Sequence, residues 1–199
     1  MKLTLLHTSP VHVVRFNALR DRIAPHAELH HVVREDLLER ARTDGVTPEI
    51  AAAVAQAVRE SPLLCTCSTL GAAAERAGAI RIDRPAMRTA ARAGDAVMLV
   101  YCLETTAAPS RALLEEEMQA AGNGAGIETL FVSEAWPLFE SGNETAFRQM
   151  IAETVRATQP RGSVVLAQAS MDGAAGLLGD LNRPVLATPE IALRTALAC

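Results

Sequence analysis

The sequence predicts an α/β protein made of two similar, doubly wound parallel-sheet domains. Short apolar runs typical of buried strands alternate with capped, helix-length segments along the whole chain. This alternation indicates parallel strands with helices on both faces of each sheet. Of the 199 residues, 49% are apolar and only 3% are aromatic, a composition that suits closely packed helices on a sheet.

An internal repeat indicates that the chain contains two copies of one architecture. Leu63–Ala74 and Ser163–Ala175 lie about half a chain length apart, and each contains an apolar strand, a polar residue at its end and a Gly-Ala-Ala helix. The polar residues are Cys67 and Gln168. Two such halves imply a pseudo-twofold relation and an interdomain cleft. We expect a first half over residues 1–95, a second half over 96–183, and a C-terminal strand and helix over 184–199.

The first half begins with an apolar strand that leads directly into a helix. Thr8-Ser9-Pro10 opens this helix and Pro25 ends it. Thr47 and Pro48 are typical cap and first residues of a later helix, which we expect to reach Arg59. Ile80 and Ile82 suggest a short, exposed strand. The strands are predicted at residues 2–7, 28–33, 62–66 and 80–82, and the helices at 11–23, 35–42, 48–59, 70–77 and 85–92.

The second half follows the same order. Residues 134–139, which include the single tryptophan, are expected to form a loop. Residues 122–126 have the glycine spacing of a nucleotide-binding loop, but they follow a helix and precede a strand, so we predict a helix stop and turn. The strands are predicted at residues 96–103, 127–133, 163–167 and 184–186, and the helices from about 110 to 121, over 145–158 and 171–181, and from 188 onward.

Composition and charge exclude several classes of function. The formal net charge is −4 and the arginines are scattered among acids, which argues against binding to nucleic acid or an anionic membrane. Charges interrupt every apolar run well short of about 18 residues, and the N-terminal apolar stretch is too short for a signal peptide. We therefore expect a cytoplasmic protein. Its four cysteines should be reduced thiols, and their spacing predicts no zinc site: Cys65, Cys67, Cys102 and Cys199.

Polar residues gather at the points where the predicted strands end. In doubly wound sheets, ligands bind beyond the carboxyl ends of the strands, so these residues are the candidates for a binding site. For Thr8 and Ser9 an ordinary helix cap is an equally good interpretation. The candidates are Thr8, Ser9, Cys67, Ser68, Thr69, Thr105, Thr106, Gln168, Ala169 and Ser170.

Cys67 is the residue in this set that can carry acid–base chemistry. It follows a strand and precedes Ser68 and Thr69, which are residues that begin helices. The N–H groups and the positive dipole end of a helix can lower a thiol pKa from about 8.5 toward roughly 3.5–7.5, and they can hold a substrate carboxylate. The alternative is that Cys67 is one more small buried residue.

Five short segments of the chain, and their order along it, resemble the aspartate/glutamate/hydantoin racemase superfamily. This superfamily also includes maleate isomerase and arylmalonate decarboxylase. Cys67-Ser68-Thr69 is similar to the Cys-Asn/Ser-Thr motif of that family. The other segments are His7-Thr8-Ser9-Pro10, Thr105–Ser110, Trp136-Pro137-Leu138-Phe139, and Pro184-Val185-Leu186 with its following helix. The resemblance implies two α/β domains with the site between them, a last helix packed on the first domain, and chemistry that needs neither cofactor nor metal.

The sequence departs from the family at the second catalytic position. Two-base racemases of this family use one cysteine from each half, and the second would fall at Gln168. A carboxamide forms hydrogen bonds but does not exchange a proton near neutral pH. Arylmalonate decarboxylases keep one cysteine at the second position instead, the reverse of this chain. Ala187 stands where many relatives have an acidic residue.

The resemblance implies an isomerase-type enzyme that does acid–base chemistry at the carbon α to a carboxylate, with Cys67 as its sole catalytic thiol. Hydrogen-bond donors around the substrate carboxylate would stabilise the charge that develops there. Alternatives are decarboxylation of a substituted malonate, a small-carboxylate binder without activity, and a dimer-forming homologue without a ligand. The expected partner is an amino acid, a hydantoin or a malonate. A homodimer or higher homo-oligomer is compatible with the alanine-rich helices.

Overall fold

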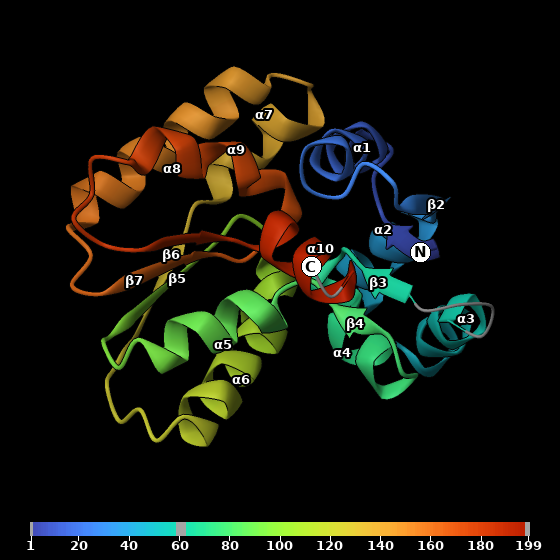
Figure 1. Ribbon diagram of the computed structural model, residues 1–199, viewed down its shortest axis with the longest axis horizontal. Coiled ribbons are helices and arrows are strands. Elements are labelled where there is room, and N and C mark those ends of the chain that lie inside the picture. Colours follow the sequence, from blue (N-terminus) through green and yellow to red (C-terminus); the bar gives the residue numbers. More distant parts are fainter. Residues whose placement is uncertain (1, 59–62, 198–199) are drawn as a thin grey trace. The chain divides into compact units, whose positions relative to one another are not determined.

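The computed structural model describes residues 2–58 and 63–197, and the chain forms two α/β units. The first unit consists of Met1–Asp83 and Pro189–Cys199, and the second of Arg84–Thr188. Each unit has one sheet of four parallel strands with flanking helices, as the sequence predicts (Figure 1). Three residues used in the sequence predictions lie outside the described residues: Arg59, Pro62 and Cys199.

The first sheet has the strand order β2-β1-β3-β4, and every neighbouring pair is parallel. Its helices follow the strands in the predicted alternation. The strands are β1 (Lys2–His7), β2 (Glu28–Val33), β3 (Leu63–Cys65) and β4 (Ile80–Arg81); the helices are α1 (Val11–Ile23), α2 (Glu35–Asp44), α3 (Pro48–Val58) and α4 (Ser68–Arg76).

Alternation of side chains along β1 places helices on its two faces. Successive strand residues point to opposite faces of a sheet. Leu6 belongs to the apolar cluster that includes Leu37 of α2 and Leu70 of α4. His7 lies on the other face, where its ring is 5.5 Å from that of Phe16 in α1. Thr8, the residue after β1, therefore lies at the end of a strand that has α2 and α4 on one face and α1 on the other.

The second sheet repeats the topology of the first, in the order β6-β5-β7-β8. Figure 1 shows α5 and α6 on one face of this sheet and α7, α8 and α9 on the other. The strands are β5 (Val97–Tyr101), β6 (Ile127–Phe131), β7 (Ser163–Leu166) and β8 (Val185–Ala187); the helices are α5 (Arg84–Arg92), α6 (Glu104–Ala120), α7 (Trp136–Glu140), α8 (Glu144–Thr158) and α9 (Asp172–Ala175). The last helix, α10 (Thr188–Leu197), belongs to the first unit from Pro189 onward.

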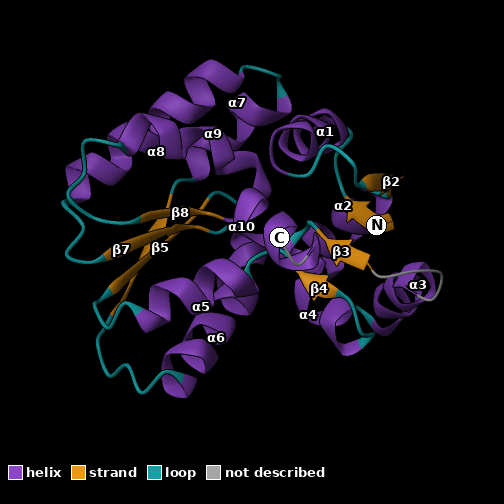
Figure 2. Cartoon of the chain, in the orientation of Figure 1, coloured by secondary structure: helices purple, strands orange, loops and turns teal. Residues whose placement is uncertain are grey.

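Two segments of the second half differ from the sequence prediction (Figure 2). The expected loop at residues 134–139 is helical, with a 3-10 turn at Ser133–Ala135 followed by α7. Proline is tolerated at the start of a helix, and Pro137 is in the first turn of α7. The expected helix over residues 171–181 is broken into short pieces, because glycine every third residue (Gly173, Gly176 and Gly179) weakens a continuous helix. The predicted turn after α6 is present at Gly122, which has φ of 67°.

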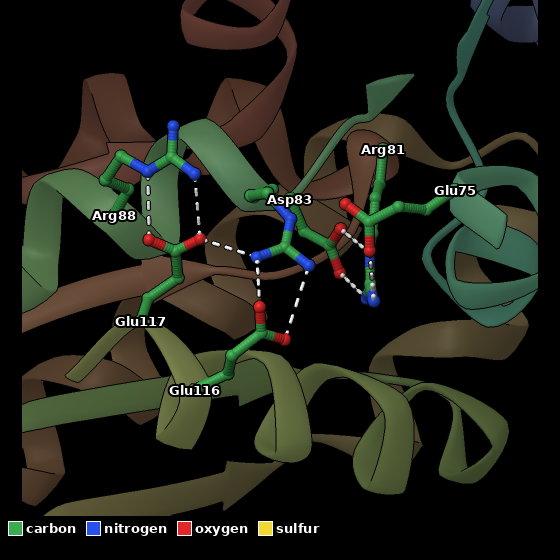
Figure 3. A network of polar contacts seen from close by, with 7 residues as sticks. Glu75, Arg81, Asp83, Arg88, Glu116 and Glu117 are labelled. Atoms are coloured by element: carbon green, nitrogen blue, oxygen red, sulfur yellow. Dashed lines mark hydrogen bonds and ion pairs between the residues drawn. The ribbon is translucent and has the colours of Figure 1, made fainter. Parts of the chain in front are cut away.

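The border between the units lies before α5, which corrects the boundary predicted at residue 95. Arg84 and Arg88 of α5 bind Glu117 of α6 through hydrogen bonds of 2.6–3.1 Å (Figure 3). These ion pairs attach α5 to the second unit. The predicted segment 184–199 is also divided, because β8 pairs with β7 while Pro189 and the residues after it belong to the first unit.

The strand predicted to be exposed at residues 80–82 is covered. It ends at Arg81, and Ile82 is fully buried. Arg81 forms a bidentate pair with Asp83 at 2.9 Å in both hydrogen bonds (Figure 3). Both side chains are buried, so the pair satisfies two charges that an apolar environment would otherwise disfavour.

Removing the charge of Glu117 is expected to loosen α5 from α6. Burial alone would raise the pKa of Glu117, but hydrogen bonds from Arg88 and Arg84 outweigh burial and leave that pKa lowered. The Glu117→Gln variant should therefore lose roughly 1–3 kcal/mol of unfolding free energy in urea, because two arginines lose the partner that neutralises them. Glu116→Gln is the matched control: its side chain is mostly exposed, and we expect a loss below about 1 kcal/mol. Equal losses in both variants would contradict this interpretation.

Candidate active site

In the first unit, the register of the sheet brings Thr8 and Cys67 together. Leu6 of β1 pairs with Cys65 of β3, and Thr8 and Cys67 each follow their member of this pair by two residues. The Thr8 side chain favours the thiolate form of Cys67 and so acts to lower the pKa of that thiol. Ser9, which is partly exposed, follows Thr8.

Cys67 occupies the N-cap position of α4, with extended φ and ψ of −105° and 114°. The backbone N–H groups of Leu70 and Thr69, in the first turn of α4, and the Thr69 hydroxyl favour its thiolate. Among the described residues, the thiol itself closes no capping hydrogen bond. Ser68 and Thr69 are buried, and Cys67 is 7% exposed. The predicted strand-to-helix switch is therefore present, with four donors around the sulfur.

The direction of the Cys67 pKa shift is the reverse of the one predicted from the sequence. Burial raises the pKa of the Cys67 thiol above its ordinary value, and the donors from Thr8, Leu70 and Thr69 lower it by less. The free energy lost when a thiolate is removed from water is larger than the free energy gained from hydrogen bonds to a helix end and two hydroxyl groups. The thiol form of Cys67 therefore predominates at neutral pH. The same cause raises the pKa of the buried Cys65, and raises that of Cys102 to about 12.

The second unit repeats this register with a carboxamide in place of the thiol. Val100 of β5 pairs with Leu166 of β7, and Cys102 and Gln168 follow these residues by two positions each. Oε1 of Gln168 accepts hydrogen bonds from the backbone N–H of Cys102 and from that of Leu103, the latter at 3.2 Å. Gln168 is 7% exposed. Its carboxamide thus binds the backbone at the start of α6.

The other predicted residues of the second unit lie in the turns after β5 and β7. Thr105 and Thr106 are in the first turn of α6, and Thr106 is buried. Ala169 and Ser170 begin a 3-10 turn after Gln168, and both are buried. The Oγ atom of Ser170 has no hydrogen-bond partner in the described part of the chain.

A buried histidine chain beside Cys67 was not found from the sequence. The Thr66 hydroxyl donates to the Leu6 carbonyl at 3.1 Å, so it accepts from Nδ1 of His7 at 2.8 Å. Nε2 of His7 is hydrogen-bonded to Nδ1 of His31, also at 2.8 Å, and Nε2 of His31 lies 3.2 Å from Oδ1 of Asn17. The two histidines are visible in the sequence, but their contact depends on how β1 pairs with β2. His31 of β2 pairs with Leu5 of β1, two residues before His7, so both rings lie on the same face of the sheet.

Two buried histidines of the first unit, His7 and His12, are neutral. Burial, and next to it the neighbouring His31, lowers the pKa of His7 to about 3. Burial, followed by Arg15 and His7, likewise lowers the pKa of His12 to about 3. Both rings therefore stay uncharged at neutral pH, and His7 supports Thr66, the residue before Cys67, through a hydrogen bond.

Within residues 2–58 and 63–197, no group of three or more His, Cys, Asp or Glu side chains is arranged to hold a metal ion. Across the same residues, no helix has the length and apolar character required to cross a membrane.

No protein-family model and no curated protein sequence matches the chain, whereas several solved structures match its fold. Aspartate racemase from Picrophilus torridus has a TM-score of 0.70 at 13% identity, covering 99% of this chain and 93% of that one. Allantoin racemase from Klebsiella pneumoniae has a TM-score of 0.65 at 20% identity, covering 100% and 86%. A variant of arylmalonate decarboxylase has a TM-score of 0.59 at 12% identity, covering 100% and 92%.

These matches run over nearly the whole chain and over most of each matched chain, and the level of identity establishes a shared fold. Glutamate racemases are among the same neighbours. The protein therefore has the two-unit α/β fold of the aspartate, glutamate and allantoin racemases and of arylmalonate decarboxylase.

Proposed function

We propose that the protein is a cofactor-independent enzyme that moves a proton at the carbon α to a carboxylate, with Cys67 as its only catalytic thiol. The observation that carries this proposal is the setting of the Cys67 sulfur, which lies where β3 gives way to α4 among donors from Thr8, Thr69 and Leu70. The fold of racemases and of a decarboxylase supports the same chemistry. Ser9 and Ser68, which flank this setting in the same unit, are the further donors proposed for a substrate carboxylate.

In the racemase or isomerase form of this reaction, the Cys67 thiolate removes the α-hydrogen as a proton. The C–H electron pair passes to the carboxylate oxygens, where hydrogen-bond donors stabilise the added charge. The resulting thiol, or water, returns a proton to the same carbon. Gln168 offers no second base, because a carboxamide does not titrate near neutral pH. Exchange of the α-hydrogen is thus the expected signature of this form.

The raised pKa of Cys67 favours decarboxylation of a substituted malonate as the second candidate. The bond between the α-carbon and one carboxyl carbon breaks, carbon dioxide leaves, and its bonding electrons remain on the α-carbon and the other carboxylate. The Cys67 thiol then donates its proton to that carbon and regains one from water. This order requires the thiol form at the start, which is the form that burial favours.

A panel of amino acids, hydantoins and substituted malonates in heavy water tests the proposal. Proton NMR would follow exchange at the α-carbon and appearance of the monoacid. We expect turnover with at least one class and a loss of about 10²–10⁴-fold in Cys67→Ser, the range typical of a lost acid–base group. Cys65→Ala is the control, because it removes a buried thiol from the same strand region. Equal rates in Cys67→Ser and the parent protein would refute the proposal.

The pH profile separates the two candidate reactions. If Cys67 begins as a base, the rate should rise with pH up to the raised pKa of the thiol, because only the thiolate accepts a proton. If Cys67 begins as an acid, the rate should be level through neutral pH and fall as the pH passes that pKa.

A further inference from the structure

β6 is an edge strand of the second sheet and lacks the usual protection of such edges. Among the described strands it pairs only with β5, in a register that continues without a bulge over all five of its residues. Folded proteins protect edge strands with lysine, proline or bulges, because an open edge can pair with another chain. β6 has the sequence Ile-Glu-Thr-Leu-Phe, in which Glu128 is the only charged residue.

The register with β5 decides which backbone groups of β6 face outward. On either side of the strand, the Gly126 carbonyl and the Val132 N–H bind β5 through hydrogen bonds of 3.1 Å and 2.9 Å. In a parallel pair, alternate residues of a strand direct their backbone groups to the same neighbour. The even-numbered residues of β6 therefore bind β5. The N–H and C=O groups of Ile127, Thr129 and Phe131 point to the open edge.

The side chains of these three residues form an exposed strip on one face of the sheet, because side chains alternate along a strand. Phe131 is 43% exposed, and its ring stacks on that of Tyr101 with the centroids 5.2 Å apart. Thr129 is also exposed, and Ile127 is partly so. Leu130 points to the opposite face, where it packs against the core of the second unit. The open edge thus carries an apolar strip beside its unpaired backbone groups.

We propose that β6 pairs with β6 of a second copy of this chain, antiparallel and with Thr129 on the twofold axis. Thr129 then lies opposite Thr129 of the second copy, and Ile127 lies opposite Phe131 of that copy. Each of these pairs joins residues whose backbone groups point outward, so each pair exchanges two N–H···O=C hydrogen bonds. One self-complementary patch serves both copies, as a twofold interface requires.

The side chains favour a second copy as the occupant because β6 is complementary to itself in this register. Pairs of an aromatic with a β-branched residue and pairs of threonines are favourable across antiparallel strands. A shift by one residue would oppose outward groups with groups already bound to β5. On the other face, Glu128 lies diagonally across from Glu128 of the second copy. Its ion pair with Arg161, at 3.9 Å, supplies a positive charge beside each carboxylate.

Sedimentation velocity at rising protein concentration tests the association, which does not depend on the chemistry of Cys67. We expect the parent to pass from monomer to dimer. Thr129→Pro removes an outward N–H and leaves the bonds to β5 intact, a change that an edge strand tolerates. Phe131→Lys replaces the exposed ring with a charge. Each variant should weaken dimerisation about tenfold or more. Leu177→Lys is the control, because Leu177 is as exposed (42%) but lies outside β6, and it should dimerise as the parent does.

Urea unfolding at a concentration where the parent is monomeric shows whether each variant folds. Phe131→Lys keeps the test valid if Thr129→Pro does not fold, because the Phe131 side chain is already largely in solvent. A monomeric parent at every concentration, or dimerisation of folded Phe131→Lys at the parent affinity, would overturn the proposal.

Cross-linking with a short bifunctional thiol reagent tests the register itself. In Thr129→Cys the two new thiols should be linked, because the Cα atoms of a hydrogen-bonded pair lie about 5.5 Å apart. In Phe131→Cys they are four residues apart along the strands, about 14 Å at 3.4 Å per residue, and should not be linked. A mixture of Phe131→Cys with Ile127→Cys should give the mixed dimer. The parent controls for its native thiols, and equal linking of Thr129→Cys and Phe131→Cys would contradict this pairing.

Discussion

Replacing Gly162 with alanine is expected to prevent the second unit from folding. A Cβ atom at this position would lie 1.9 Å from the carbonyl oxygen of Ala96 and 2.8 Å from its carbonyl carbon. Both atoms belong to the backbone and cannot rotate away. Gly162 and Ala96 directly precede Ser163 and Val97, which pair in the two central strands β7 and β5. The substitution therefore forces these strands apart at their first paired residues.

The loss in Gly162→Ala should exceed the 4–5 kcal/mol that marks exceptional single substitutions. Soluble yield and a circular dichroism melt would measure it. Gly124→Ala is the control, because a Cβ there meets nothing within 4 Å and the backbone does not require glycine. A Gly162→Ala protein that melts cooperatively at the parent temperature would show that the strands can separate without penalty.

Acid is expected to destabilise the first unit well before its carboxylates titrate. His7 and His12 have pKa values lowered to about 3 by burial, against about 6.5 in an unfolded chain. Between these values the unfolded state binds more protons than the folded state, so stability falls as the pH falls. Each histidine should cost about 2 kcal/mol between pH 7 and pH 5.

Urea unfolding at several pH values between 7 and 5 would measure this dependence. His12→Gln should reduce the slope of stability against pH by about one proton, whatever its effect on stability at pH 7. Val14→Gln, which replaces an exposed residue of the same helix that has no titratable group, should leave the slope unchanged. A slope in His12→Gln equal to that of the parent would show that His12 does not bind a proton on unfolding.

The strand-to-helix switches could be predicted because their signals are local. An apolar run followed by Cys67-Ser68-Thr69 ends a strand and begins a helix, and Gln168 follows the same signal in the second half. The structure ends these strands at Cys65 and Leu166, so each side chain lies two residues beyond its strand, where the prediction had it directly after the strand. The two sheets and their order of helices follow from the same alternation.

The histidine chain and Thr188 could not be predicted because their surroundings come from distant segments. His7 meets Thr66 and His31 only after β1 has paired with β2 and β3. Thr188 has no chemical signal of its own in the sequence, where it reads as a helix cap. Only the structure shows that its hydroxyl group is buried after β8, the strand that pairs with β7, and has no hydrogen-bond partner among the described residues.

The sequence alone determined the α/β class, the repeat of two four-stranded sheets and the location of Cys67 and Gln168 at strand ends, because short-range propensity and hydrophobic pattern encode these features. The tertiary structure decided the sign of the Cys67 pKa shift, the fixed direction of the Gln168 carboxamide and the border before α5. Each of these depends on burial, hydrogen bonding or ion pairing with residues far away in the chain, and local sequence does not specify those distances.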